Sequence, residues 1–261
     1  MSFIPNFPTK LHQDAAEIVR DYFLSRPGVD TVLVVNSCAR GEAVPESDLD
    51  IAILAKPGTD ANRIKTFETD WLNYSASQLA ILRYKQSTPF SHLHLDIITG
   101  NYIPATIELG EPIDNFEIEI GNQICYSAPM DNAGPFFLTL ESKWLPYYNN
   151  DLRSIRLQMV RNACNYDLDH IPFLIKRGLY FHAFYILNKA FQEFLQAIFI
   201  ANNTYPIAYN KWIKEQVVNY LKMPDLYPRL SPILSVKNIE SREMNDKAKM
   251  LRRLLSELTD D

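Results

Sequence analysis

The chain has 261 residues, of which 47% are apolar and 22% are charged, and its formal net charge is −5. These values are typical of a globular protein with one large domain or two ordinary ones. They argue against a nucleic-acid partner, which would favour a basic surface, and the sequence holds no apolar run long enough to span a membrane.

The first half of the chain alternates between helix and strand patterns. Apolar positions at helical spacing predict a helix over residues 11–25. The β-branched run TVLVV at 31–35 predicts a buried strand, and DLDIAIL at 48–54 predicts a second one. A helix is expected to follow, with Thr59 or Asp60 as its N-cap.

The pattern then becomes weaker. The run LAILRY at 79–84 is consistent with a strand, and HLHLDIIT at 92–99 predicts another. Residues 104–126 alternate weakly between glycine and proline breaks, so we expect them to add strands or an irregular excursion. This half is therefore predicted to be a mixed sheet flanked by helices.

The second half is poor in glycine and rich in aromatic residues, which favours a helical bundle. Asn210 is the expected N-cap of one of its helices. Helices are predicted over residues 151–164, 180–201, 211–221 and 240–258. The fold class is thus α+β, a small mixed sheet with flanking helices followed by a C-terminal α-helical bundle. We place the division after residue 135, giving domains at 1–135 and 136–261.

The strand at 48–54 begins with two aspartates, Asp48 and Asp50, separated by one residue. Because side chains alternate between the faces of a strand, both carboxylates lie on one face, and Leu49 and Ile51 lie on the other. Two carboxylates this close repel each other, and a divalent cation such as Mg²⁺ compensates them well. The alternative is an edge strand with a solvated polar face.

The turn before these aspartates favours the metal interpretation. The sequence NSCARG at 36–41 follows a strand and is expected to begin a short helical turn. Its backbone N–H groups, the Ser37 hydroxyl and the Arg40 guanidinium suit an anion such as a phosphate.

The later strand at 92–99 adds a third carboxylate, Asp96. His92 and His94 share its face, and we expect them to line the sheet or orient a neighbour rather than to bind a transition metal. A phosphate-binding turn and three acids on adjacent strands suit metal-assisted phosphoryl or nucleotidyl transfer.

These residues together resemble a family signature. In that signature a strand is followed by a Gly-Ser pair, a short spacer with Arg-Gly, and Ser-Asp-x-Asp at the start of the next strand. Here it reads NSCARG at 36–41 and SDLD at 47–50, with Asp96 as the third acid. Over about residues 29–100 the chain resembles the DNA polymerase β-like nucleotidyltransferase superfamily. The helical half is similar to that of the kanamycin- and lincosamide-type antibiotic nucleotidyltransferases.

The resemblance implies catalytic and metal-binding roles for Asp48, Asp50 and Asp96. Asp48 and Asp50 would hold one or two Mg²⁺ ions against the β- and γ-phosphates of ATP or another nucleoside triphosphate. Asp96 would either complete a second metal site or accept the proton of the attacking hydroxyl, and both roles stay open. Ser47 would orient the loop. The nucleotide-binding residues implied are Asn36, Ser37, Arg40, Gly41, Ser47 and Lys211, the last at an expected helix start.

Asn36 stands where the family keeps a glycine. Glycine at this position lets the backbone approach the triphosphate and take unusual dihedral angles. Asparagine tolerates the left-handed region best after glycine, so we expect the loop to be kept. The alternatives are weakened nucleotide binding or an inactive descendant of the family.

The function implied is transfer of a nucleoside monophosphate to a hydroxyl group of a small acceptor such as an antibiotic, an EC 2.7.7 type of reaction. One alternative is a catalytically weak antitoxin or regulatory module that binds a protein or RNA partner. Asn36, in place of the family's glycine, keeps this alternative open. The R-x4-H pattern from Arg177 to His182 resembles a HEPN motif, although a core or helix-start role is favoured for it. Another is a protein AMPylator with a Tyr or Ser acceptor. The resemblance also allows a homodimer.

The three cysteines are widely spaced and form no CxxC pair or disulfide framework. The N-terminal residues lack the basic start and apolar core of a signal peptide. We therefore expect reduced thiols in a cytoplasmic protein.

Overall fold

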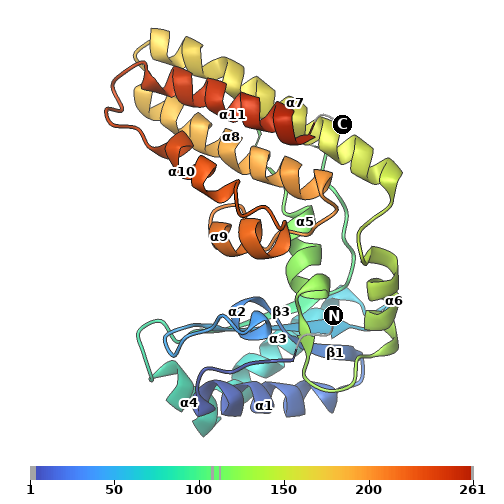
Figure 1. The fold of residues 1–261 in the computed structure, drawn as a ribbon. Coiled ribbons are helices and arrows are strands. Elements are labelled where there is room, and N and C mark those ends of the chain that lie inside the picture. Colours follow the sequence, from blue (N-terminus) through green and yellow to red (C-terminus); the bar gives the residue numbers. More distant parts are fainter. Residues whose placement is uncertain (1–3, 107–108, 112, 260–261) are drawn as a thin grey trace. The chain divides into compact units, whose positions relative to one another are not determined.

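The computed structural model describes residues 4–106, 109–111 and 113–259, and the chain forms two compact units. Unit 1 comprises Met1–Tyr102 and Glu119–Leu145, and unit 2 comprises Ile103–Ile118 and Pro146–Asp261. These units are defined by contacts, so the division of the chain after residue 135 stays a prediction. The predicted α+β class is confirmed, because a four-stranded sheet with helices is followed by a largely helical region (Figure 1).

The sheet of unit 1 is mixed, with the strand order β3-β2-β1-β4. Strand β1 pairs antiparallel with β2 and with β4, whereas β2 and β3 are parallel. The predicted strands at 31–35, 48–54 and 92–99 are all confirmed. The strands are β1 (Val29–Val34), β2 (Leu49–Ala55), β3 (Leu93–Ile98) and β4 (Ala128–Pro129).

Helices cover one face of the sheet of unit 1. Apolar residues of α1, α3 and α4 form one core with the inward side chains of β1 and β2. Asp60 caps α3 by accepting hydrogen bonds from Asn62 N and Arg63 N, which confirms one of the two predicted caps. The helices here are α1 (Lys10–Leu24), α2 (Asn36–Arg40), α3 (Ala61–Ser75), α4 (Leu79–Lys85) and α6 (Pro135–Trp144).

One expectation for this region is wrong, and of the two alternatives for residues 104–126 the strands do not form in the described part. The run at 79–84 forms helix α4 rather than a strand, because its fully buried residues Ile81 and Tyr84 are three positions apart, a helical spacing. No strand lies in the described part of 104–126. The chain forms α5 (Phe116–Ile120) and the π-helix η1 (Gly121–Cys125), since its buried apolar residues recur every four positions.

Unit 2 is a helical bundle built on α7, α8 and α11, whose apolar faces share one core. The predicted helix at 180–201 is confirmed as α8, and the helix predicted at 151–164 continues to residue 176. Asn210 is not a cap, because Trp212 has a positive φ of 59° and the helix begins after it. The elements are α7 (Asn150–Lys176), α8 (Tyr180–Ala201), α9 (Ile213–Glu215), η2 (Gln216–Tyr220), α10 (Tyr227–Leu234) and α11 (Glu243–Thr259).

Two buried charged clusters lie inside unit 2. Arg156, 1% exposed, donates hydrogen bonds to the carboxylates of Asp114 and Glu117. Lys189 donates from Nζ to Asp167 at 2.6 Å and to Glu193 at 2.9 Å. In each cluster one buried cation therefore compensates the charge of two carboxyl groups in a low-dielectric interior.

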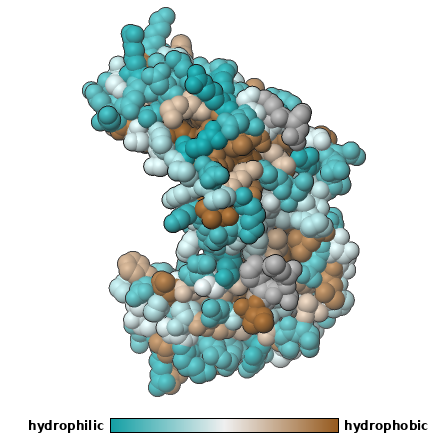
Figure 2. Space-filling view, in the orientation of Figure 1, coloured by the Kyte–Doolittle hydropathy of each residue, from teal (hydrophilic) through white to brown (hydrophobic). Residues whose placement is uncertain are grey.

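The surface drawn in Figure 2 is mostly hydrophilic, with apolar side chains in separate patches on both units. Among the residues that the structure describes, no helix combines the length and the apolar character needed to cross a membrane.

Candidate active site

The two aspartates lie at the start of β2. Asp48 directly precedes the strand and Asp50 is its second residue. The residues between and after them point into the core, with Leu49 fully buried and Ile51 1% exposed. The expected separation of an acidic face from an apolar face is therefore confirmed.

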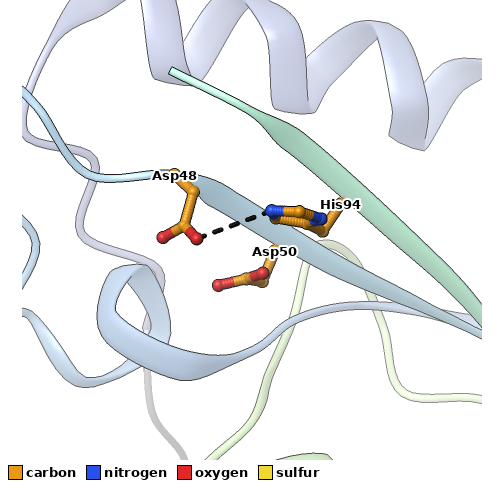
Figure 3. A group of neighbouring side chains, drawn as sticks. All are labelled: Asp48, Asp50 and His94. Atoms are coloured by element: carbon orange, nitrogen blue, oxygen red, sulfur yellow. Dashed lines mark ion pairs between the residues drawn. The ribbon is translucent and has the colours of Figure 1, made fainter. Parts of the chain in front are cut away.

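A histidine from the neighbouring strand completes a group with these aspartates (Figure 3). One ligand atom from each of Asp48, Asp50 and His94 lies within 4.8 Å of the others. Nε2 of His94 is 3.6 Å from Oδ2 of Asp48, and the two side chains are 56% and 46% exposed. The group is therefore open to solvent and to a ligand.

The parallel register of β2 and β3 decides which residues face the aspartates. Asp50 pairs with His94, and Ala52 pairs with Asp96. Asp96 lies on the same face as His94 but one strand repeat farther from Asp48, and it is not part of the three-residue group. The sequence pattern predicts that His94 lines the sheet, and the strand register is the signal that places it beside the aspartates.

In the turn before β2, Asn36 adopts a backbone conformation that glycine takes easily. Asn36 has a φ of 57°, in the left-handed region, so the conformation expected for it is confirmed. Gly41 has a φ of 79° and ends α2, with its N–H donating to the carbonyl of Ser37. Ser37 is 7% exposed, and Arg40 is the last residue of α2.

Hydrogen bonds tie this turn to β2. The backbone N–H of Val35 donates to the carbonyl of Asp50 at 3.1 Å. The hydroxyl oxygen of Ser47 accepts a hydrogen bond from the Val44 N–H at 3.0 Å, which closes the loop ahead of Asp48. This contact accords with the loop-orienting role expected for Ser47.

Two buried side chains hold the starts of the strands. The hydroxyl of Tyr84 lies 3.1 Å from the carbonyl oxygens of both Ser47 and His92, which precede β2 and β3. Nε2 of His12 lies 3.0 Å from the Ser47 carbonyl, and its Nδ1 lies 2.8 Å from the Thr9 hydroxyl. A carbonyl can only accept, so Nε2 of His12 donates to Ser47.

A cysteine lies behind the aspartates without the properties of a nucleophile. Cys38 is 1% exposed, and its sulfur is 3.9 Å from the carbonyl of Asp48. Burial, with the nearby carboxylates of Asp50 and Asp48, raises the pKa of the Cys38 thiol to about 12. The thiol is therefore neutral at physiological pH and serves as packing.

Lys211 lies in unit 2, so the geometry of the group in unit 1 does not include it. It is exposed and lies outside the helices, two residues before α9, whereas the sequence suggested a helix start.

The donor set fits a divalent cation. Two carboxylates supply the hard oxygen ligands that Mg²⁺ prefers, and ligands about 2.1 Å from one ion lie within about 4.2 Å of each other. The limit of 4.8 Å within the group means that small side-chain movements bring all three donors onto one ion.

The N-terminal part of the chain matches a known domain family. Residues 16–108 match the family model described as the nucleotidyltransferase domain. Among solved structures, the chain is similar to a nucleotidyltransferase-like protein from Exiguobacterium sibiricum. The two have 12% sequence identity and a TM-score of 0.42 over 95% of this chain and 75% of that chain. A comparison with curated proteins gave no match.

Proposed function

Starting from a nucleotidyltransferase domain at residues 16–108, we propose that the protein is a magnesium-dependent nucleotidyltransferase. It transfers a nucleoside monophosphate from ATP or another nucleoside triphosphate to a hydroxyl group of a small molecule. The observation that carries the proposal is the group of Asp48, Asp50 and His94, held directly after a turn with glycine-like backbone at Asn36.

The positions of the acids support the roles proposed for them. Asp48 and Asp50 would hold one or two Mg²⁺ ions, which would supply positive charge to neutralise the triphosphate. Asp96 lies outside the group of three and one repeat farther along β3, which supports a role as general base.

In the proposed reaction Asp96 removes the proton of the acceptor hydroxyl, and the resulting oxygen attacks the α-phosphorus. The bond between the α-phosphorus and the oxygen that bridges to the β-phosphate breaks, and pyrophosphate leaves with that electron pair. The products are a nucleotidylated acceptor and pyrophosphate.

The triphosphate is proposed to bind at the turn. The backbone of Asn36 and Gly41, the hydroxyl of Ser37 and the guanidinium of Arg40 all belong to this segment, and Ser47 shapes the loop that follows. Such short turns bind phosphate through convergent N–H groups and a cation. From the sequence alone, Lys211 is proposed as one more phosphate contact.

For the acceptor we propose a small hydroxylated molecule such as an antibiotic. The resemblance to the kanamycin and lincosamide enzymes motivates this choice, and the net charge of −5 suits a cationic acceptor. A homodimer is proposed on the same resemblance, and a cytoplasmic location is proposed from the widely spaced cysteines.

The test is pyrophosphate release with Mg²⁺, screened over four nucleoside triphosphates and a panel of hydroxylated acceptors. The double variant Asp48→Asn with Asp50→Asn should lose both release and Mg²⁺-dependent nucleotide binding. The matched control is Glu68→Gln with Asp70→Asn, two exposed acids on α3, which should behave like the wild type. Nucleotide binding that is unchanged in the first double variant would contradict the proposal.

A second candidate is a regulatory module that binds a protein or RNA partner. The observation that favours it is a set of exposed aromatic rings around the α7–α8 connection, with Phe173, Phe181 and Tyr185 being 53%, 71% and 56% exposed. Arg177 lies over the ring of Phe173, and His182 stacks on Tyr185.

The same pyrophosphate screen separates these candidates. Absence of turnover, together with a protein or RNA that co-purifies stoichiometrically, would favour the module. Turnover on a Tyr or Ser hydroxyl of a protein would identify an AMPylator, which uses the same site.

A further inference from the structure

We infer that His94 is a direct metal ligand, so that the site has a mixed nitrogen and oxygen donor set and selects Mn²⁺ over Mg²⁺. The inference rests on the proposed function for its two carboxylates, and it adds a ligand and a metal preference. Strand β3 places the imidazole of His94 opposite Asp50 and beside Asp48.

The register makes this placement a property of the sheet rather than of one rotamer. Leu49, Ile51 and Ile53 are buried on β2, and they pair with Leu93, Leu95 and Ile97 of β3. A slip of β3 by one residue would turn its apolar side chains outward. The core therefore fixes His94 on the face of the aspartates.

The distance between His94 and Asp48 suits coordination of one shared ion better than a direct hydrogen bond between the two side chains. Nε2 of His94 and Oδ2 of Asp48 are 3.6 Å apart, which is longer than a hydrogen bond. Two neighbouring ligands of one ion, each at about 2.1 Å, are about 3.0 to 3.5 Å apart. Both side chains are about half-exposed, so an ion can enter from solvent.

The donor chemistry then sets the preference. Mg²⁺ prefers oxygen ligands and near-ideal octahedral geometry, whereas imidazole suits first-row transition metals. Mn²⁺ accepts both carboxylates and imidazole, so one nitrogen ligand increases the ratio of Mn²⁺ to Mg²⁺ affinity. The site still accepts Mg²⁺ through Asp48 and Asp50.

A structural alternative gives a different result in the same experiment. In that alternative His94 is only a counter-charge that keeps Asp48 and Asp50 from repelling each other before an ion binds. The imidazole would then leave when the ion arrives, and no nitrogen would be bonded to the metal.

The experiment uses the full chain without an affinity tag, loaded with Mn²⁺ and a non-hydrolysable nucleoside triphosphate. Electron spin-echo envelope modulation detects a ¹⁴N nucleus bonded directly to Mn²⁺. Titration of Mn²⁺ and of Mg²⁺ gives the affinity ratio. We expect ¹⁴N modulation in the wild type, its loss in His94→Ala, and a fall in the Mn²⁺-to-Mg²⁺ affinity ratio of at least about tenfold, as for loss of an outer-shell partner.

The matched control is His92→Ala. His92 is exposed, it lies two residues before His94, and it is outside the group of three. This variant should keep both the ¹⁴N signal and the affinity ratio. His94→Asp should bind both ions without the ¹⁴N signal, because it restores an all-oxygen donor set.

Two outcomes would overturn the inference, and they differ in what they say of the proposed function. If the wild type binds Mn²⁺ without ¹⁴N modulation, His94 is not a ligand, and the proposed carboxylate site is not affected. If the double variant Asp48→Asn with Asp50→Asn binds Mn²⁺ as well as the wild type does, the two carboxylates are not ligands. The proposed function would then be contradicted as well.

Discussion

Two groups of acidic side chains, one in each unit, are in opposite environments. In unit 1, Asp48 is 46% exposed and lies beside a half-exposed histidine at the start of a strand. In unit 2, Glu117 and Glu193 are fully buried, and each accepts a hydrogen bond from a buried cation, Arg156 or Lys189. Buried carboxylates need a partner inside the protein, whereas exposed ones remain available to a ligand.

This difference separates charges that maintain a fold from charges that are available for chemistry. Glu117 and Glu193 stabilise unit 2 only while their cations are present, because loss of the cation leaves buried charge without compensation. Asp48 and Asp50 are expected to contribute little to the stability of unit 1 or to oppose it through mutual repulsion. The following variants test the contrast from its largest expected effect to its smallest.

The largest effect is expected for Arg156→Met. The guanidinium accounts for charged hydrogen bonds to both Asp114 and Glu117, so its removal should lower the free energy of unfolding by about 3–5 kcal/mol. Urea unfolding measures the loss, and hydrogen exchange should increase most in α7 and α8. Adding Asp114→Asn and Glu117→Gln should restore much of the stability.

The control for this change is Arg229→Met. Arg229 pairs with Glu257 on the surface, where both side chains are more than 40% exposed, so we expect a loss below about 1 kcal/mol. Equal losses in the two arginine variants would break the comparison between buried and exposed charges.

The second effect concerns pH. Burial, with the nearby Asp167, raises the pKa of Glu193 to about 7 from an ordinary value of 4.5. Between these values the folded state keeps a proton that the unfolded state releases, so stability falls as pH rises through this window and levels off above about 7. The loss attributable to this group is about 3 kcal/mol.

Glu193→Gln should remove this pH dependence while its amide oxygen still accepts from Lys189. The measurement is the free energy of unfolding of the variant minus that of the wild type, at several values between pH 5 and pH 8. The difference should shift in favour of the variant as pH rises. A constant difference would mean that Glu193 is charged throughout.

The sequence was informative wherever the pattern is local. Alternation along β2 placed Asp48 and Asp50 on one face, and the tolerance of asparagine for positive φ placed Asn36 in the left-handed region. Both properties depend on a residue and its immediate neighbours, so no knowledge of the tertiary fold was needed.

Properties that depend on pairing were missed. His94 lies beside the aspartates because it pairs with Asp50 in the parallel register of β2 and β3. The buried apolar residues of these two strands, which are far apart in the sequence, fix that register. The cluster of Arg156 with Asp114 and Glu117 joins residues separated by about 40 positions, and a periodic pattern in the sequence does not predict such a contact. Helix α4 was mistaken for a strand because short apolar runs fit both periods.

A third, smaller effect is expected for Tyr84→Phe in unit 1. Loss of the hydroxyl leaves the carbonyls of Ser47 and His92 without this donor, at a cost of about 1 kcal/mol in urea unfolding. The same change should weaken Mn²⁺ binding, since the starts of β2 and β3 position the metal group. Tyr74→Phe, at a partly exposed position of α3, is the control and should change neither quantity. Unchanged metal binding in Tyr84→Phe would show that these strand starts are held by other contacts.

The smallest effect on stability is expected at the candidate active site itself. Asp48→Asn with Asp50→Asn relieves repulsion between two partly exposed carboxylates, so the free energy of unfolding should stay the same or rise by up to about 1 kcal/mol in metal-free buffer. Adding Mn²⁺ should stabilise the wild type and leave the double variant unchanged, because only the wild type binds the ion. A stability loss as large as that of Arg156→Met would mean that these aspartates maintain the fold. Charge would then serve the same structural purpose in both units.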